Sequence, residues 1–373
     1  MKPVARRVSI FAIALGLLVT GCARQGQRAA APGTITLNGA GATFPYPLYS
    51  KWLDEYAKVA PQVRINYQSI GSGGGIQQLK AGTVDFGASD APLSDEETKA
   101  MPGAVVHIPT AAGAVVIAYN LPGVRGLRLS PDALADIFLG NVTRWNDKTI
   151  ASLNPRASLP NLAIAVAHRS DGSGTTYIFT HYLAAVSKPW AERVGAGKSV
   201  NWPVGIGGKG NEGVTGVVKQ TPGGVGYVEL AYAVGNKLSY ARMRNAAGNF
   251  VEPSVASTTA AAAGAADKMK RDIRVSIVNA PGVEAYPIAG FTYLLAYRDQ
   301  KHPTKGEALA GFLDWAVHDG QRFAEPLLYA PLPLAVVKLD EGAIATVRTG
   351  EAPSPPSTSR GLRPQGRPAG SGR

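Results

Sequence analysis

Four short segments of the sequence combine glycine or hydroxyl residues with the expected start of a helix. Glycine lets backbone N–H groups approach a ligand closely, and the first turn of a helix presents unpaired N–H donors with a partial positive charge. Such a shell of donors suits a tetrahedral oxyanion. The segments are Gly-Ala-Gly-Ala-Thr-Phe-Pro at 39–45, Gly-Ser-Gly-Gly-Gly at 71–75, Gly-Ala-Ser-Asp at 87–90 and Arg-Ser-Asp-Gly-Ser-Gly-Thr-Thr at 169–176.

Each segment also has an ordinary structural explanation, because glycine loops before helices are common in α/β folds. Ser173 or Asp171 could cap a helix. Asp90 could be a turn residue, and Arg169 could lie on the surface. The occurrence of four such segments in one chain favours a shared binding site.

The elements that would position these segments alternate between strands and helices. This alternation predicts an α/β architecture. Period-two and apolar runs predict strands at 35–37, 63–67, 105–108, 115–119 and 163–166. Helical spacing predicts helices at 46–58, 76–81 and 175–186, a capping box at 94–97 that opens another, and a surface helix or loop in the alanine-rich stretch 256–266.

The composition indicates a globular chain with a non-uniform charge. The chain has 373 residues, of which 45% are hydrophobic and 17% charged, enough for two domains with buried cores. About half of the formal net charge of +12 lies in the two ends, in residues 1–21 and in the four arginines after position 351. The middle of the chain has no dense basic run interleaved with aromatics, so nucleic acid is not an expected partner.

The N-terminus has the pattern of an export signal. A basic start precedes the apolar stretch 8–19, which is too short to span a bilayer. Val-Thr-Gly-Cys at 19–22 resembles a bacterial lipobox, which predicts a signal peptide at 1–21, a lipidated Cys22 and a tether at 22–33. An ordinary signal peptide that happens to hold a cysteine is the alternative. We expect a periplasmic or extracytoplasmic protein anchored to the membrane through Cys22, with a disordered basic tail at 349–373.

Longer stretches around these motifs resemble the phosphate-binding protein of the bacterial high-affinity phosphate ABC transporter. The resemblance covers about 36–333 and rests on 39–56, 68–97, 168–184, 136–140 with Trp145, 207–211 and 223–229. It implies a two-lobed periplasmic-binding-protein fold (type II-like, Venus flytrap) with two crossover strands as the hinge. The implied crossings fall near 111–115 and 285–290. The implied lobes are 34–112 plus 286–348 for lobe I, and 113–285 for lobe II.

The resemblance also implies a phosphate site, carried over position by position. Phe44 and Gly174 would contribute backbone N–H groups, and Asp171 would hold the guanidinium of Arg169. The sequence departs from the family at Gly73, where relatives often have a second serine. The implied contacts are Thr43, Phe44, Ser72, Asp90, Arg169, Asp171, Ser173, Gly174 and Thr175.

Asp90 gives the implied site its selectivity. An ionised carboxylate can only accept hydrogen bonds, so it suits an anion that keeps a proton near neutral pH, as phosphate does and sulfate does not. The resemblance implies phosphate as the ligand, permease subunits in the inner membrane as partners, a monomer, no enzyme activity, and neither cofactor nor metal.

Other functions fit the sequence less well. The Gly-x-Ser-x-Gly motif of serine hydrolases has glycine two residues before the serine, but Ile70 holds that position before Ser72 and Asp171 holds it before Ser173. This difference disfavours a secreted phosphatase-like enzyme. No histidine pair has metal-binding His-x-x-x-His spacing, and segment 71–80 lacks the P-loop pattern. Asp90 disfavours sulfate and molybdate as ligands. An adhesion or sensing role for a phosphate-binding surface protein stays open.

Overall fold

The computed structural model describes residues 33–349, and the compact unit analysed below begins at Ile35. The expected signal peptide, Cys22, almost all of the tether and the tail beyond Thr349 lie outside the described residues. The strands are β1 (Ile35–Gly41), β2 (Val63–Ser69), β3 (Phe86–Ser89), β4 (Val105–Tyr119), β5 (Arg128–Leu129), β6 (Ala165–Arg169), β7 (Ile206–Gly208), β8 (Gly224–Glu229), β9 (Ser239–Tyr240), β10 (Arg242–Arg244), β11 (Phe250–Val251), β12 (Ala289–Tyr297), β13 (Asp299–Gln300) and β14 (Arg348–Thr349). The helices are α1 (Tyr46–Val59), α2 (Ser72–Ala81), α3 (Asp95–Lys99), α4 (Pro131–Leu139), α5 (Lys148–Ala151), α6 (Gly174–Val186), α7 (Lys188–Arg193), α8 (Gly210–Gln220), α9 (Leu230–Gly235), α10 (Val255–Ala262), α11 (Ala265–Met269), α12 (Pro303–Val317) and α13 (Leu334–Ile344).

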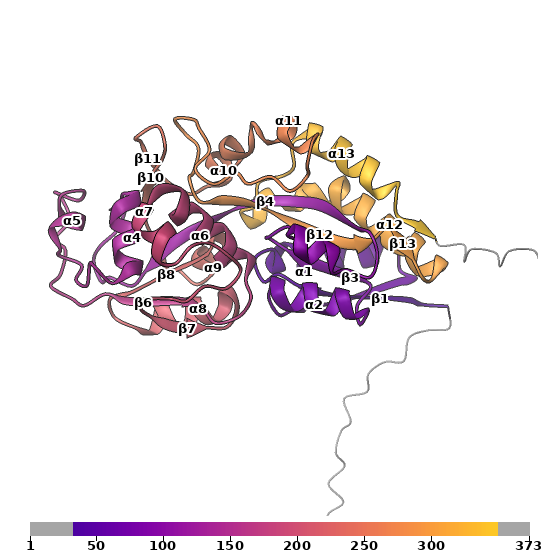
Figure 1. Ribbon diagram of the computed structural model, residues 1–373, viewed down its shortest axis with the longest axis horizontal. Helices are drawn as coiled ribbons and strands as arrows, with labels where there is room; N and C mark the ends of the chain where they lie inside the picture. The colour runs from indigo at the N-terminus through magenta and orange to yellow at the C-terminus, as the bar shows by residue number, and fades with distance from the viewer. Residues whose placement is uncertain (1–32, 350–373) are drawn as a thin grey trace, which may run out of the picture. The chain divides into compact units, whose positions relative to one another are not determined.

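Strand β4 is the element that two groups of strands share. The main sheet has the order β2-β1-β3-β12-β4-β8-β6-β7, with β9 also paired to β4 (Figure 1). The first part of β4, Val105–Ala114, pairs with β12, whereas its last part, Val115–Tyr119, pairs with β8. The strands therefore divide into a first lobe built on β1–β3 and a second lobe built on β6–β8, and β4 belongs to both.

The sequence predicted two separate strands where β4 is continuous. Residues 109–114 between them read Pro-Thr-Ala-Ala-Gly-Ala, which has no alternating pattern of large side chains. They stay extended because β12 pairs with them, and Gly113 lies opposite Gly290 in that pairing. The two glycines leave room for side chains that pack over the crossing strands, because a Cβ at Gly113 would lie 2.5 Å from the ring of Phe44 and one at Gly290 would lie even closer to Ile178. The partner change falls between Ala114 and Val115; the exact lobe limits stay a prediction.

Within each lobe, parallel pairing places the carboxyl ends of neighbouring strands at the same edge of the sheet. β1 pairs in parallel with both β2 and β3, and β6 pairs in parallel with β7 and β8. In open α/β sheets, ligand sites form at the carboxyl ends of such strands, where loops lead into helices. Here the loops after β1, β2 and β6 lead into α1, α2 and α6.

Each lobe has an aromatic core that fixes these loops. In the first lobe, Trp52 of α1 is fully buried and donates from Nε1 to the carbonyl of Gly320 at 2.7 Å. In the second lobe, Phe179 of α6 stacks on Tyr227 of β8, with ring centroids 4.3 Å apart. Because these side chains are large and buried, α1 and α6 are held rigidly to their sheets.

Most of the predicted helices are confirmed. The structure has α1 and α6 within one residue of the predicted limits, and the capping box forms: the Ser94 hydroxyl accepts from the N–H of Glu97 at 3.1 Å. The prediction for α2 was too short, since the helix begins in the glycine cluster at Ser72. The alanine-rich stretch forms the helices α10 and α11; it buries one face, with Ala261 and Ala262, and exposes Ala256 and Ala263 on the other.

Thr349, the first residue of the expected tail, belongs to a strand, and the rest of the expected tail lies outside the described residues. Thr349 forms β14 with Arg348, and this short strand pairs in parallel with β13. The pairing ties the end of the first lobe to the loop after β12.

Candidate anion-binding site

The N-termini of α2 and α6 meet at the fully buried hydroxyl of Ser72. Its Oγ accepts hydrogen bonds from the N–H of Gly174, at 3.1 Å, and from the N–H of Asp90, at 3.3 Å. Gly174 is the first residue of α6 in the second lobe, whereas Ser72 and Asp90 belong to the first lobe. One side chain therefore joins the two lobes where two helix N-termini place their partial positive charge.

The close approach of the lobes depends on glycine. Gly73 donates its N–H to the carbonyl of Gly172 at 2.8 Å, and a Cβ atom at Gly73 would lie 3.1 Å from the Cα of Gly172. A Cβ atom at Gly174 would lie 2.5 Å from Oδ2 of Asp90. The departure from the family pattern at Gly73 therefore falls at a contact between lobes.

Arg169 and Asp171 form a buried, forked ion pair. Nε and Nη2 of Arg169 donate to the two carboxylate oxygens of Asp171 at 2.8 and 2.6 Å, and Nη1 donates to Oγ1 of Thr175 at 3.2 Å. Burial alone would raise the pKa of Asp171, but the hydrogen bonds and charge of Arg169, with the N–H of Gly210, hold that pKa below its ordinary value. Asp171 therefore stays ionised and fixes the guanidinium, whose charge it largely offsets.

Asn211, for which the sequence suggested no role, connects the first loop to this ion pair. Its Nδ2 donates to Oγ1 of Thr43 at 2.8 Å and to Oγ1 of Thr175 at 3.1 Å, and its own N–H also points to Thr43 at 3.2 Å. Asn211 is fully buried in the first turn of α8. The glycine-rich segment 207–210, which precedes Asn211 and leads into α8, has the same pattern as the other loops and could have pointed to this residue.

Of the two predicted site residues with a carboxyl group, Asp171 is paired with Arg169, whereas Asp90 has no hydrogen bond to a cationic side chain among the described residues. It is 3% exposed, and its Oδ1 accepts from Oγ1 of Thr292 at 2.8 Å. Burial raises the pKa of Asp90 to about 7, against the opposing effects of the Thr292 hydrogen bond and the charge of Arg169. The carboxyl group therefore gains or loses its proton near neutral pH.

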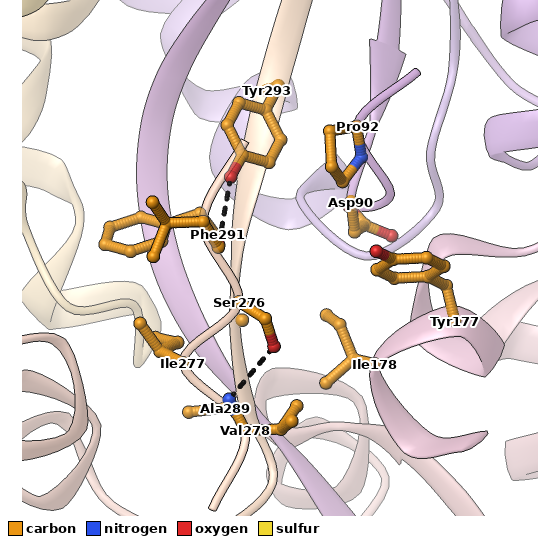
Figure 2. Close-up of a pocket in the computed structure, with 12 residues that line it drawn as sticks. Asp90, Pro92, Tyr177, Ile178, Ser276, Ile277, Val278, Ala289, Phe291 and Tyr293 are labelled. Atoms are coloured by element: carbon orange, nitrogen blue, oxygen red, sulfur yellow. Dashed lines mark hydrogen bonds between the residues drawn. The ribbon is translucent and has the colours of Figure 1, made fainter. Parts of the chain in front are cut away.

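A mostly apolar pocket lies beside the buried carboxyl group of Asp90. Figure 2 shows Asp90, Pro92 and Tyr177 on one side of this pocket, with Ile277 and Val278 across from them. Because the surrounding side chains are mostly aromatic or aliphatic, they offer a charged carboxylate few polar partners.

The remaining predicted residues lie in the same place. The N–H groups of Phe44 and Thr175 have no hydrogen-bond partner within the described part of the chain, which leaves both free to donate. Ser173 caps α6, since its Oγ accepts from the N–H of Thr176 at 3.0 Å, so the structural explanation for this serine holds. All nine predicted residues therefore lie in one region, because each contacts another of them or is next to one in the sequence.

A second buried carboxyl group, Glu229, lies behind the site and was not foreseen. Its Oε2 accepts from the N–H of Ala231 at 2.8 Å and lies 3.1 Å from the hydroxyl of Tyr329, which donates its proton to the carbonyl of Phe44 at 2.7 Å. Burial raises the pKa of Glu229 well above its ordinary value. Burial therefore favours the uncharged form of Glu229.

The arrangement suits one kind of ligand. Fixed N–H dipoles, hydroxyl groups and a compensated arginine surround a point next to a carboxyl group that titrates near neutral pH. Residues 33–349 contain no cluster of three or more metal-ligating side chains, and no helix among them is long and apolar enough to cross a bilayer. The geometry fits a tetrahedral oxyanion that carries a proton.

Comparisons with known proteins agree with this geometry. A family model described as "PBP superfamily domain" matches residues 26–319. The chain is 46% identical over 327 residues to "Phosphate-binding protein PstS" of Xylella fastidiosa, covering 86% of this chain and 89% of the relative. It is 40% identical to "Phosphate-binding protein PstS" of Methanocaldococcus jannaschii, covering 91% of this chain and 96% of the relative.

Solved structures share the two-lobed fold. A phosphate-binding protein from Stenotrophomonas maltophilia has a TM-score of 0.64 at 22% identity, covering 82% of this chain and 93% of that one. A high-affinity periplasmic phosphate-binding protein, PfluDING, solved with bound phosphate, has a TM-score of 0.67 at 24% identity, covering 83% and 93%. The sequence-based prediction of a two-lobed α/β periplasmic-binding-protein fold is confirmed.

Proposed function

This chain belongs to the family of PstS phosphate-binding proteins, and we propose on that premise that it binds inorganic phosphate between its lobes and delivers it to a membrane ABC importer. The two relatives named above are phosphate-binding proteins, and the match covers 89% and 96% of their lengths. The observation that carries the proposal is the place of Asp90, a single buried carboxyl group among donors from both lobes.

Asp90 explains why the ligand is phosphate and not another oxyanion. Near neutral pH phosphate keeps a proton that an ionised Asp90 accepts, whereas sulfate would place a bare oxygen against the carboxylate. A site built around one specific hydrogen bond rejects an analogue that lacks it by about 10⁴–10⁵-fold, because a buried polar group is left unpaired. The same reasoning disfavours molybdate.

Most of the other predicted residues supply donors, while Asp171 holds Arg169 and Ser173 caps α6. Thr43, Ser72 and Thr175 contribute hydroxyl groups, and the first turns of the helices contribute N–H groups. Arg169 adds a fixed cation that Asp171 holds in place. Bonds of this charge-assisted kind contribute about 1.5–3 kcal/mol each. A dissociation constant in the micromolar range or tighter corresponds to about −8 kcal/mol and needs only a few of them.

Phosphate binding would close the lobes about the crossover strands β4 and β12. Two ion pairs support a closed form, because both join α3 of the first lobe to the second lobe: Lys198 with Glu97 at 2.7 Å, and Arg274 with Asp95 at 2.7 Å. Hinge closure around a ligand is the usual motion of periplasmic binding proteins. The closed form is the one that the permease subunits in the inner membrane would recognise.

The location of the protein follows from its N-terminus. A lipid on Cys22 would anchor an extracytoplasmic monomer to the membrane through the segment 22–33, close to the importer. Mass spectrometry of the membrane-extracted protein tests this: a diacylglyceryl-modified N-terminal Cys22 is expected, and a mature chain that begins elsewhere would contradict the anchor.

An enzyme is not expected here, because no nucleophile in the site has a base beside it. The Ser72 hydroxyl accepts from two N–H groups, and the Ser173 hydroxyl caps α6. We therefore expect no turnover of phosphate esters. Measurable phosphatase activity of the pure protein that the Ser72→Ala exchange abolishes would overturn this.

The decisive test of the proposed selectivity is the Asp90→Asn exchange. An amide can donate a hydrogen bond, so sulfate affinity should rise relative to phosphate, whereas arsenate, which is also protonated, should still compete. Titration calorimetry with the three anions measures this. The matched control is Asp54→Asn, at an exposed position of α1, which should change no affinity. An unchanged sulfate-to-phosphate ratio in the Asp90 variant would refute the role of Asp90.

A further inference from the structure

Thr292 holds the carboxyl group of Asp90 from the side opposite the donors. Thr292 is fully buried in β12, one of the two crossover strands, and its Oγ1 lies 2.8 Å from Oδ1 of Asp90. We propose that Thr292 is a positioning residue that orients and keeps ionised the carboxylate of Asp90, and thereby sets the discrimination between protonated and unprotonated oxyanions. This inference rests on the proposed function.

The pairing of β12 with β4 is irregular next to Thr292. Thr292 lies opposite Ala111, whereas its neighbour Tyr293 lies opposite Pro109, so Thr110 of β4 is left out of the ladder. Such an extra residue bends the strand that carries it, here β4. The irregularity is where β12 passes Asp90.

Side chains lock this irregular strand in place. Thr110 Oγ1 donates to the carbonyl of Thr292 at 3.1 Å and lies 2.7 Å from the hydroxyl of Tyr49 in α1. All three residues are buried. A threonine whose carbonyl and backbone are fixed in this way has little freedom to turn its hydroxyl elsewhere.

The hydrogen bond from Thr292 occupies one of the two carboxyl oxygens of Asp90. The Thr292 hydroxyl has one proton, and Oδ1 of Asp90 is an acceptor within reach of it. With Oδ1 engaged, Oδ2 stays available for the O–H of a bound anion; Oδ2 lies on the side of Gly174, at the N-terminus of α6. Thr292 therefore favours the charged carboxylate and directs its free oxygen toward the ligand.

The other charged and titratable groups near Asp90 do not replace this contact. Arg169 of β6 attracts the carboxylate, but its fork is bonded to Asp171. Glu229 lies near enough to interact with Asp90, and burial raises the pKa of Glu229, which favours its uncharged form. Phenols whose pKa is raised by burial also surround Asp90: Tyr49 of α1, Tyr67 of β2, Tyr177 of α6, Tyr293 of β12 and Tyr329 of the segment before α13.

Loss of the Thr292 hydroxyl would change the proton on Asp90. Burial raises the pKa of Asp90 to about 7, and the Thr292 hydrogen bond is the largest effect that opposes this rise. Without it the pKa would lie higher, so Asp90 would carry a proton at pH 7–8. A protonated Asp90 can donate to sulfate, so discrimination would weaken at a pH where the original protein still discriminates.

The test compares Thr292→Val, which keeps the shape but loses the hydroxyl, with Thr292→Ser, which keeps the hydroxyl. Phosphate and sulfate affinities are measured by titration calorimetry from pH 6 to pH 9 on the original protein, both variants and Asp90→Asn. We expect Thr292→Val to lower the phosphate-to-sulfate ratio at pH 8 by about tenfold or more, the effect of one hydrogen bond to a charged group. Its selectivity should also be lost at a higher pH, while Thr292→Ser follows the original protein.

The outcomes separate this inference from the proposed function. If the original protein does not bind phosphate, the proposed function fails. If it binds phosphate and Asp90→Asn loses selectivity while Thr292→Val keeps the original ratio and pH profile, only the role of Thr292 is wrong. Equal losses in the valine and serine variants would show a packing role and also overturn it. If the valine variant does not fold, Thr292→Ala against Thr292→Ser provides the same comparison.

Discussion

Replacing Arg169 with alanine should weaken phosphate binding by more than the loss of one contact. The Arg169 side chain is 1% exposed and holds three hydrogen bonds, two to Asp171 and one to Thr175. Loss of one charge-assisted bond to phosphate costs about 1.5–3 kcal/mol, which corresponds to about 10–150-fold in affinity. That is the minimum effect, because the exchange also leaves Asp171 without its partner.

The unpaired Asp171 provides a sharper test than the single exchange. Its side chain is 13% exposed, and Arg169 keeps its pKa below the ordinary value against the effect of burial. Without Arg169, an ionised Asp171 would repel the anion. The double variant Arg169→Ala, Asp171→Asn should therefore bind phosphate more tightly than Arg169→Ala alone, and its loss of affinity should differ from the sum of the two single losses by about 0.5–3 kcal/mol.

Titration calorimetry at pH 8 and low salt measures all four proteins of this cycle. The matched control is Arg242→Ala, which removes an arginine from an exposed pair with Glu252 and should leave the affinity unchanged. The reasoning is refuted if Arg169→Ala binds within about threefold of the original protein, which is less than one charge-assisted bond. It is equally refuted if the double variant binds no better than the single one.

Three further predictions concern pH, salt and stability. Because Asp90, with a pKa of about 7, gains a proton as the pH falls, competition by sulfate against phosphate should strengthen from pH 8 to pH 6, and a constant ratio would contradict this. Lys198→Ala breaks a half-buried pair with Glu97, so the dissociation constant for phosphate should rise by up to about fivefold at low salt and by much less in 1 M salt; a larger loss that salt does not screen would mean another role. Asp340 is buried with both carboxyl oxygens unpartnered in the described part of the chain, and burial raises its pKa to about 9. The free energy of unfolding should therefore fall as the pH rises from about 4 to about 9, by up to about 1.4 kcal/mol per pH unit. Urea unfolding of Asp340→Asn should give a flatter pH profile, and identical profiles would show that this carboxyl group is not the cause.

The sequence was most informative where local patterns decide the structure. Helix α6 could be predicted from its apolar spacing and from Ser173, which is indeed its N-cap. The four loops could be found because glycine and hydroxyl residues gather where helices begin. The site residues came from motifs that relatives share, and the structure brings those residues together.

What could not be predicted depends on contacts between distant parts of the chain. The middle of β4 has small residues with no strand pattern of their own, and only its pairing with β12 keeps it extended. Asn211 contacts Thr43 across 168 positions, and Thr292 contacts Asp90 across 202. In the sequence Thr292 is one hydroxyl in an apolar strand, and nothing local distinguishes it from a residue that merely packs.

Direct titration of the purified protein with phosphate and sulfate at pH 8 tests the central claim, that a proton on the bound anion is recognised by Asp90. We predict a dissociation constant for phosphate in the micromolar range or tighter, and weaker binding of sulfate, by a factor that grows as the pH rises above the Asp90 pKa of about 7. Equal affinity for the two anions, or no heat of binding with phosphate, would contradict the account.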